Sequence, residues 1–300
     1  MARAHIALLP DGRRLHLQDG PIDLIVEAWA GRADVEAAYR AAAERFVTIL
    51  DELCAELPLL RTAAHPVRNE LTGIVAQRMQ KAVASFSKQI FITPMAAVAG
   101  AVAEEILGAM TAAAPLARAY VNNGGDIALH LAPGESFKIA MIDRPDRPSL
   151  FGTATIGHEA PVRGIATSGW RGRSFSLGIA DAVTVLAPGA AMADAAATVI
   201  ANAVDLPGHR GILRLPATDL QPDSDLGPRL VTRHVPELTQ GQIAAALDAG
   251  QATALSLQAR SLIVAAALHL QGQTRFIGIA SDAIVPQLFN PAPMKAIAHA

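Results

Sequence analysis

The segment AMADAAATVIANAV, residues 191–204, constrains the fold most, because nearly all of its side chains are small and apolar. A helix of this composition allows neighbouring backbones to approach closely, so we expect it to be tightly packed. Asp194 and Thr198 are four residues apart and therefore share one helix face. Their oxygens suit Mg²⁺ or Ca²⁺ rather than Zn²⁺. The structural alternative is that Asp194 caps the helix and Thr198 bonds back to a backbone carbonyl.

The composition excludes several classes of protein. The 300 residues are 51% hydrophobic, 17% charged and 4% aromatic, which is typical of a globular chain. A net charge of −2 without a basic block argues against nucleic-acid binding. We see no signal peptide and no apolar run that approaches the roughly 20 residues of a membrane helix. The single cysteine, Cys54, cannot form an internal disulfide, so we expect a cytoplasmic protein, with no membrane partner. Because Cys54 lies among apolar neighbours within a predicted helix, we expect its thiol to be buried.

Apolar spacing along the chain predicts an α+β fold in one domain over residues 1–300. Helical patterns cluster early and strand patterns late, which favours α+β over an alternating parallel sheet. Residues 205–235 show no clear periodicity, and we interpret them as irregular. The predicted helices cover residues 34–60, 67–85, 93–110, 191–204 and 239–250, where Gly250 is the expected stop. The predicted strands lie within residues 4–28, 117–132, 137–143, 153–157, 161–169, 174–188 and 262–281.

The stretch VNNGGDIAL, residues 121–129, is a second candidate for ligand contact. Asn123 and Asp126 flank the pair Gly124-Gly125, and glycine allows a backbone to approach a ligand closely or to adopt a positive φ. An ordinary hairpin turn requires the same residues, so this stretch leaves both interpretations open.

The stretch TSGWRGR, residues 167–173, combines hydroxyls, glycines, two guanidinium groups and an indole. Arginines and backbone amides suit phosphate oxygens, and Trp170 is able to stack on a planar ring. The alternative is a solvated turn. The candidate ligand contacts in this stretch are Thr167, Ser168, Gly169 and Arg171.

These segments resemble, in the same order, the conserved segments of ApbE-like proteins, whose best-known members are FAD:protein FMN transferases. The resemblance covers residues 90–205 and is carried by VNNGGDIAL, the TSG strand and VTVLAPGAAMADAAAT, while TPMAAVAGAVAEE is similar to a diverged form of the family's Gly-Ile-Ala-Lys-Gly helix. It implies an α+β fold of two interleaved mixed α/β halves, with FAD or FMN in the cleft between them. It also implies that Asp194, Thr198 and the backbone carbonyl of Ala97 bind Mg²⁺.

The chain departs from this family at two places. Ala99 stands where transferases usually carry a lysine, and residues 174–181 replace a His-x-x-Asp-Pro segment. Asp181 and Glu104 are the candidate replacements by position, with Asp181 a possible cofactor contact.

Two functions remain open. The first is a Mg²⁺-dependent enzyme that transfers FMN to an acceptor protein or cleaves the FAD pyrophosphate. The alternative is a non-catalytic protein that binds flavin or another small metabolite. A structural subunit with a vestigial pocket and a homo-oligomeric assembly are also open.

Overall fold

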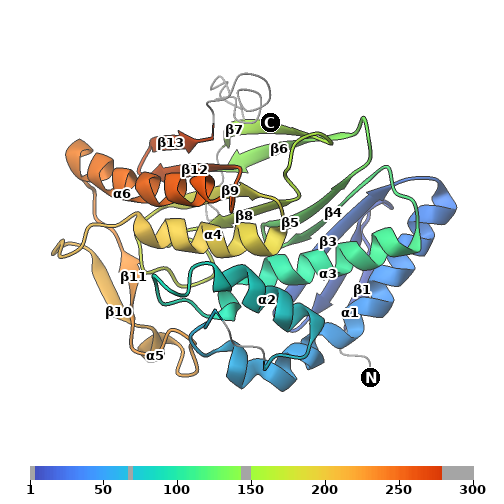
Figure 1. Ribbon diagram of the computed structural model, residues 1–300, viewed down its shortest axis with the longest axis horizontal. Helices are drawn as coiled ribbons and strands as arrows, with labels where there is room; N and C mark the ends of the chain where they lie inside the picture. The colour runs from blue at the N-terminus through green and yellow to red at the C-terminus, as the bar shows by residue number, and fades with distance from the viewer. Residues whose placement is uncertain (1–3, 67–69, 143–149, 279–300) are drawn as a thin grey trace.

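A nine-stranded antiparallel sheet forms the centre of the computed structural model, which describes residues 4–66, 70–142 and 150–278 (Figure 1). The strand order is β1-β2-β3-β4-β5-β8-β9-β12-β13, and every pairing along it is antiparallel. The α+β prediction is therefore confirmed. The strands are β1 (His5–Leu8), β2 (Leu15–Asp19), β3 (Ile22–Trp29), β4 (Arg118–Asn123), β5 (Asp126–Leu131), β8 (Gly164–Ser168), β9 (Ala182–Ala187), β12 (Ala265–Leu270) and β13 (Gln273–Ile277).

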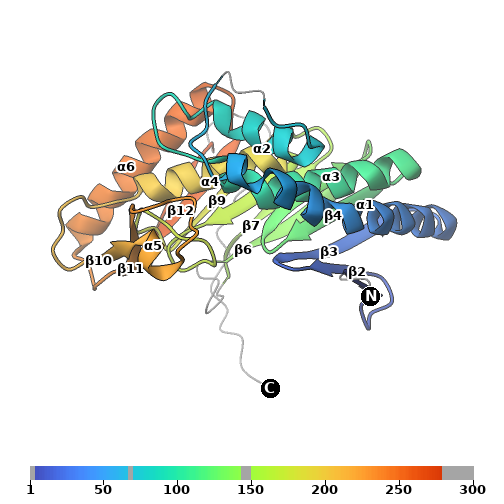
Figure 2. The same ribbon diagram turned by 90° about the horizontal axis from the view of Figure 1, so that it is seen from below.

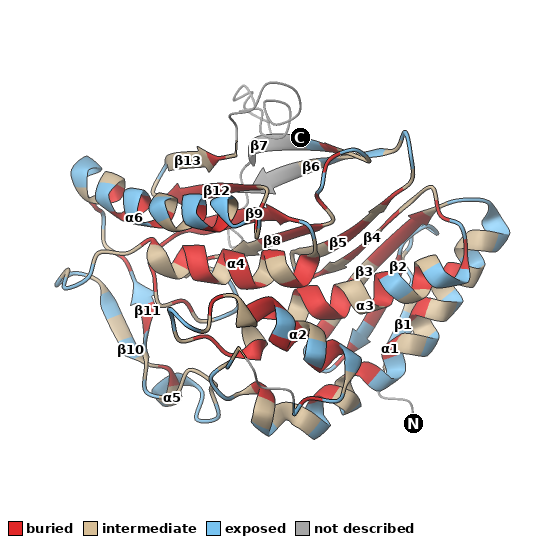
Figure 3. Cartoon of the chain, viewed as in Figure 1, coloured by how far each residue is buried: buried red, intermediate tan, exposed pale blue. Residues whose placement is uncertain are grey.

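The long helices lie on one face of this sheet (Figure 2). The central pair is α3 (Val98–Ala113), which contacts β4 and β5, and α4 (Ala190–Ala203), which contacts β8 and β9. Around them lie α1 (Arg32–Leu60), α2 (Ile74–Ala84), the 3₁₀ turn η1 (Pro94–Ala97) and α6 (Gln240–Ala259), while the short α5 (Ala217–Leu220) lies apart from this layer. Buried residues concentrate in α3, α4 and the strands beneath them (Figure 3), so the main core lies between sheet and helices.

Two hairpins complete the described part of the chain. On the sheet's other face, a smaller cluster that includes Leu129 and Leu186 packs against Phe137 of the hairpin β6 (Ser136–Ile142) and β7 (Leu150–Gly157). The second hairpin, β10 (Leu213–Pro216) and β11 (Leu230–His234), pairs apart from the large sheet.

Several predicted boundaries were wrong. Residues 205–235 contain β10, α5 and β11 rather than irregular chain, and β9 begins only at Ala182. Helix α2 begins at Ile74, whereas residues 67–69 of its predicted range lie outside the described residues. Gly250 does not end α6, because its missing side chain serves helix packing: a Cβ there would overlap Val204 after α4.

The predicted burial of Cys54 was also wrong, because the residue is exposed. The buried face of α1 runs through Phe46, Ile49 and Leu53. Cys54 follows Leu53 directly, and one residue turns the side chain about 100° around a helix, away from that face.

One segment, Pro94–Ala113, is long and apolar enough to cross a membrane by length and composition, contrary to the sequence-based expectation. It comprises η1 and α3. It contacts α1, α2, α4 and the sheet. A core helix passes the same test of length and composition as a membrane-spanning helix.

Candidate functional site

The helices α3 and α4 cross at their N-terminal ends, and small residues make this crossing possible. A Cβ on Gly100 of α3 would overlap the backbone carbonyl of Ala190 at the start of α4. Alanines fill the rest of the contact, and Ala193 and Ala197 are among those that are almost completely buried. The composition of residues 191–204 is thus explained by close packing on both sides of the helix.

Each of these two helices caps the other. The first N–H groups of a helix have no partner within it, and neither α3 nor α4 has a side-chain cap of its own. The Gly100 N–H donates to Asp194 Oδ2 at 3.0 Å, and the Ala191 N–H donates to Glu104 Oε1 at 2.9 Å. Asp194 is therefore fixed in orientation by the N-terminus of α3.

Thr198 lies one turn after Asp194 on the same helix, and both residues are half-buried. The alternative roles of this pair, helix capping by Asp194 and a bond from Thr198 to a backbone carbonyl, are observed only in part. Asp194 caps α3 rather than its own helix, whose N-cap is Gly189. Within the described residues the Thr198 hydroxyl has no hydrogen-bond partner, so it does not bond back to a carbonyl.

The glycine pair forms the turn between β4 and β5 beside α3. Gly124 and Gly125 have φ values of +64° and +116°, a region that favours glycine. Before the turn, Asn123 Nδ2 donates to the Ala99 carbonyl at 3.2 Å. After it, Asp126 Oδ1 accepts the Thr167 N–H at 3.3 Å. The turn therefore lies against the same end of α3 as Asp194.

Asp126 and Asp194 form an electrostatically coupled pair. The pKa of each carboxyl group is raised, and burial of that group is the largest cause, although both residues keep some exposed surface. Burial raises the pKa of Asp126 to about 7, against the opposing effects of the Thr167 amide and the Arg173 charge. Burial and the negative charge of Asp126 together raise the pKa of Asp194 well above its ordinary value. A nearby cation would relieve this repulsion.

The donor atoms at this position fit a hard divalent cation. Asp194 and Thr198 supply oxygen, and Asp126 adds a second carboxylate close by. Ala97 is fully buried in η1, which packs against α4. No cluster of three or more His, Cys, Asp or Glu side chains suited to a metal occurs in the described chain, so a Zn²⁺-type site is not supported there.

The TSG strand contributes in two different ways. Thr167 holds Asp126 through its N–H, and its hydroxyl lies 2.9 Å from that of Thr184 on β9. Ser168 ends β8 half-buried. A Cβ on Gly169 would lie 2.5 Å from the Asp181 carbonyl, so this glycine permits close backbone packing.

Arg171 and Asp181, both predicted ligand contacts, form an ion pair with each other. Arg171 Nε lies 2.6 Å from Asp181 Oδ1, which also accepts from the indole of Trp170 at 3.2 Å. The other oxygen of Asp181 accepts the Gln271 N–H at 2.7 Å. The Arg171 guanidinium lies over Trp170, with 4.4 Å from its carbon to the ring centroid. These contacts tie the loop after β8 to the turn after β12.

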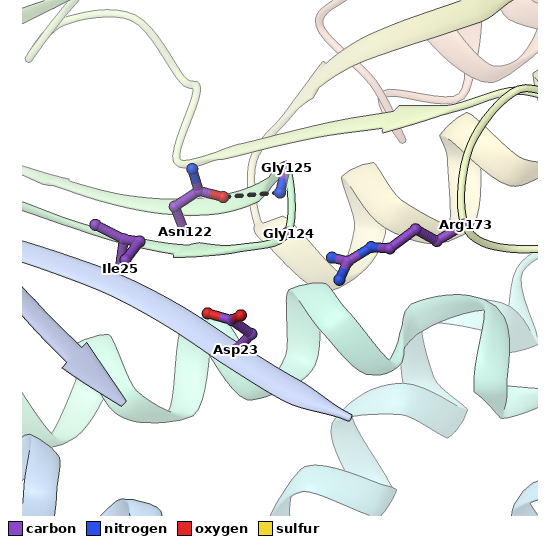
Figure 4. Close-up of a pocket in the computed structure, with 6 residues that line it drawn as sticks. All are labelled: Asp23, Ile25, Asn122, Gly124, Gly125 and Arg173. Atoms are coloured by element: carbon purple, nitrogen blue, oxygen red, sulfur yellow. Dashed lines mark hydrogen bonds between the residues drawn. The ribbon is translucent and has the colours of Figure 1, made fainter. Parts of the chain in front are cut away.

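A cavity of about 220 Å³ lies beside the glycine turn, at one end of β3 and β4 (Figure 4). It is lined by Asp23, Ile25, Asn122, Gly124, Gly125 and Arg173. Asp194 and Thr198 do not line it. Arg173 and Asp23 were not among the predicted contacts. The stretch TSGWRGR indicated a guanidinium, but local sequence does not tell which of its two arginines faces the turn.

Comparison with known proteins gives a consistent family. The family described as AbpE bacteria matches residues 6–276. A UPF0280 protein of Methanopyrus kandleri is 38% identical over 177 residues, which cover 57% of this chain and 68% of that protein. Another, from Methanosphaerula palustris, is 34% identical over 185 residues, which cover 57% of this chain and 71% of that protein.

Two solved structures are also similar along most of the chain. An ApbE protein of Thermotoga maritima covers 91% of this chain and 96% of its own at 12% identity and a TM-score of 0.47. The flavin transferase ApbE of Vibrio cholerae, in a variant form, has the same coverage at 10% identity and a TM-score of 0.36. Because both TM-scores are below 0.5, the membership of the chain in a family rests on the family match over residues 6–276. The chain belongs to the family described as AbpE bacteria and is thus an ApbE-like protein, as its motifs indicate.

Proposed function

We propose that this protein handles a flavin nucleotide, FAD or FMN, together with Mg²⁺. Membership of the ApbE-like superfamily, whose best-known members are FAD:protein FMN transferases, supports the general kind of ligand. One observation carries the proposal: α4 presents on one face the carboxylate of Asp194 and the hydroxyl of Thr198, which has no hydrogen-bond partner among the described residues. The buried carboxyl of Asp126 is close enough to raise the pKa of Asp194. Oxygen ligands of this kind suit Mg²⁺.

In this proposal Asp194 and Thr198 hold the cation, and the Ala97 carbonyl is the third protein ligand. Bound Mg²⁺ neutralises charge on phosphate oxygens. The protein's own contribution is to fix the acidic groups: the Gly100 N–H orients Asp194, and the Thr167 N–H orients Asp126. The glycine turn leaves open space at Gly125, where a Cβ would meet no atom within 4 Å, so a phosphate is able to approach the backbone there.

The proposed enzyme reaction transfers FMN from FAD to a threonine of an acceptor protein. The hydroxyl oxygen of an acceptor threonine forms a bond to the FMN phosphorus of FAD. The bond from that phosphorus to the bridging pyrophosphate oxygen breaks, AMP leaves with this oxygen, and the hydroxyl proton is released. With water in place of the threonine, the same step yields FMN and AMP.

A second candidate, a non-catalytic flavin-binding protein, is favoured by a specific observation. Glu104 and Asp181, the candidate replacements for the family's lysine and His-x-x-Asp-Pro segment, are both engaged in structural contacts. Glu104 accepts the Ala191 N–H and pairs with Arg78 at 3.2 Å, while Asp181 pairs with Arg171. Release of AMP from FAD decides between the two candidates.

The test is a titration of purified protein with FAD, with and without Mg²⁺, following flavin fluorescence and AMP release together. Asp194→Asn is the informative variant, because the amide oxygen still accepts the Gly100 N–H while the charge is lost. Asp248→Asn is the matched control, since that side chain is 66% exposed on α6.

We expect Mg²⁺ to strengthen FAD binding in the wild type and in Asp248→Asn, and to have little effect in Asp194→Asn. AMP release would establish the enzyme, and Mg²⁺-dependent binding without release would establish the binding protein. Equal FAD affinity in Asp194→Asn and wild type at all Mg²⁺ concentrations would refute the metal site.

A further inference from the structure

The side chain of Arg173 lies directly across the glycine turn. A Cβ on Gly124 would overlap Nη2 of Arg173, so the absence of a side chain at this position gives the guanidinium its place. Figure 4 shows the side chain extending from its loop toward Gly124. Gly124 thus has two reasons to be glycine: its positive φ and the space that Arg173 occupies.

The guanidinium of Arg173 is available to a ligand. The residue is exposed, and no hydrogen bond or ion pair joins its side chain to any residue that the structure describes. Arg171, two residues earlier, contrasts with it, because its guanidinium is paired with Asp181 at 2.6 Å. Of the two arginines in this loop, Arg173 is the one whose guanidinium makes no ion pair with a described residue.

The cavity beside the turn has the size of a subsite. Its volume of about 220 Å³ is below the roughly 300–1,000 Å³ of pockets that enclose a whole small ligand. Among the other polar side chains lining it, Asn122 Oδ1 accepts the Gly125 N–H at 2.8 Å, and Asp23 hydrogen-bonds to His16 at 3.0 Å. Arg173 is therefore the cationic donor in the described lining of the cavity, and its planar group matches two oxygens of a phosphate.

Among the charged side chains named around the turn, the attraction for an anion comes from Arg173. Asp126 and Asp194 would repel a phosphate, and Asp23, half exposed, adds a screened negative charge at the cavity. Arg173 is close enough to Asp126 for its positive charge to favour the ionised carboxylate. It therefore places a positive charge near Asp126.

We propose that Arg173 binds a phosphate group of the ligand, in the cavity formed by Asp23, Ile25, Asn122 and the Gly124-Gly125 turn. This rests on the proposed function in taking a flavin nucleotide as the ligand. The contact itself requires only a phosphate. Arg173 acts as a binding residue of this cavity, separate from the cation ligands on α4.

The test compares ligands that differ only in phosphate. Wild type, Arg173→Gln and Arg173→Lys are titrated with FMN, riboflavin and inorganic pyrophosphate in the presence of Mg²⁺. Arg32→Gln is the matched control for the lost charge, because that side chain is 94% exposed on α1. Circular dichroism and thermal unfolding establish that each variant folds.

Loss of a charged hydrogen bond should weaken FMN and pyrophosphate binding in Arg173→Gln by about tenfold or more, with riboflavin binding unchanged. Arg173→Lys should recover part of the affinity, because it keeps the charge but not the two-oxygen contact. If pyrophosphate binds through Arg173 and no flavin binds, the flavin proposal fails and the phosphate contact stands. The Arg173 proposal would be overturned if Arg173→Gln bound FMN and pyrophosphate as tightly as wild type does. It would also be overturned if the wild type bound neither ligand.

Discussion

Asp194 of α4 accepts the N–H of Gly100 at the start of α3, 94 residues earlier in the chain. Glu104 of α3 makes the converse contact with Ala191 of α4. The two helix N-termini are thus held together by exchanged carboxylates, each placed where the partial positive charge of the other helix lies. The candidate cation ligands lie at this junction, so the group that joins the helices also orients the site.

The Asp194 variants separate the capping role from the charge. Asp194→Ala removes the acceptor for Gly100 and should lower the free energy of unfolding by about 1 kcal/mol in metal-free buffer. Asp194→Asn keeps an acceptor and removes the charge that Asp126 opposes, so it should be at least as stable as wild type above pH 7. Urea unfolding followed by circular dichroism measures both. Equal destabilisation by Ala and Asn would contradict the capping role.

The Glu104 cap is connected to a wider network. Arg78 of α2 reaches Glu104 at 3.2 Å and Glu105 at 2.9 Å, and Arg45 of α1 reaches Glu105 at 2.7 Å. Burial of Glu105 opposes the ionised form, and its two arginines outweigh this and keep its pKa below the ordinary value. Glu104 therefore links α2 and α3 to the start of α4, and the neighbouring Glu105 adds α1 through Arg45.

Glu104→Ala should lower the free energy of unfolding by about 1–3 kcal/mol, because it leaves the Ala191 N–H without its acceptor and breaks the contact with Arg78. Glu36→Ala is the control: its partner Arg32 is exposed on the surface of α1, and such pairs contribute about 0–1 kcal/mol. Denaturant midpoints compare the two variants. A loss in Glu104→Ala no larger than in Glu36→Ala would show that the cap is not needed.

The sequence predicted what depends on local spacing. The helix at 34–60 and the final hairpin were recognised because apolar residues repeat along each element, and the observed α1, β12 and β13 confirm them. The shared face of Asp194 and Thr198 follows from the same periodicity. Their role as metal ligands stays a prediction.

The remaining features depend on contacts between distant segments. Nothing near Asp194 in the sequence indicates that its partner is Gly100, and Gly250 looks like a helix stop until Val204 is seen beside it. Likewise, Arg171 and Arg173 are equivalent in sequence. They differ because Asp181 lies against one and the glycine turn against the other.

The pKa of Asp126 predicts a specific pH dependence for the metal-free protein. Burial raises this pKa from 3.8 to about 7, so between these values the folded state binds more protons than the unfolded state. The free energy of unfolding should therefore fall as pH rises from about 4 to about 7, and Asp126 should add no further slope above that range. The raised pKa of Asp194 acts in the same direction.

Urea unfolding at a series of pH values in EDTA measures this slope, and Asp126→Asn should reduce it, because the amide does not titrate. The variant should also be more stable than wild type near pH 8, where the wild type carries a buried charge. An unchanged slope in Asp126→Asn would assign the effect to other groups.

Two glycines of α3 provide a matched test of the helix crossing. Gly100 faces Ala190, whose carbonyl a Cβ would overlap, whereas a Cβ on Gly108 meets no atom within 4 Å. Gly100→Ala should therefore force α3 and α4 apart and cost about 1–3 kcal/mol, the usual range for overpacking. Gly108→Ala should stabilise by up to about 1 kcal/mol through helix propensity alone. Thermal and urea unfolding compare the stability of the two variants. If both substitutions stabilise the protein, the backbones of α3 and α4 do not meet closely at Gly100. Because Gly100 also donates to Asp194, Gly100→Ala should weaken Mg²⁺-dependent flavin binding as well, while Gly108→Ala leaves it unchanged.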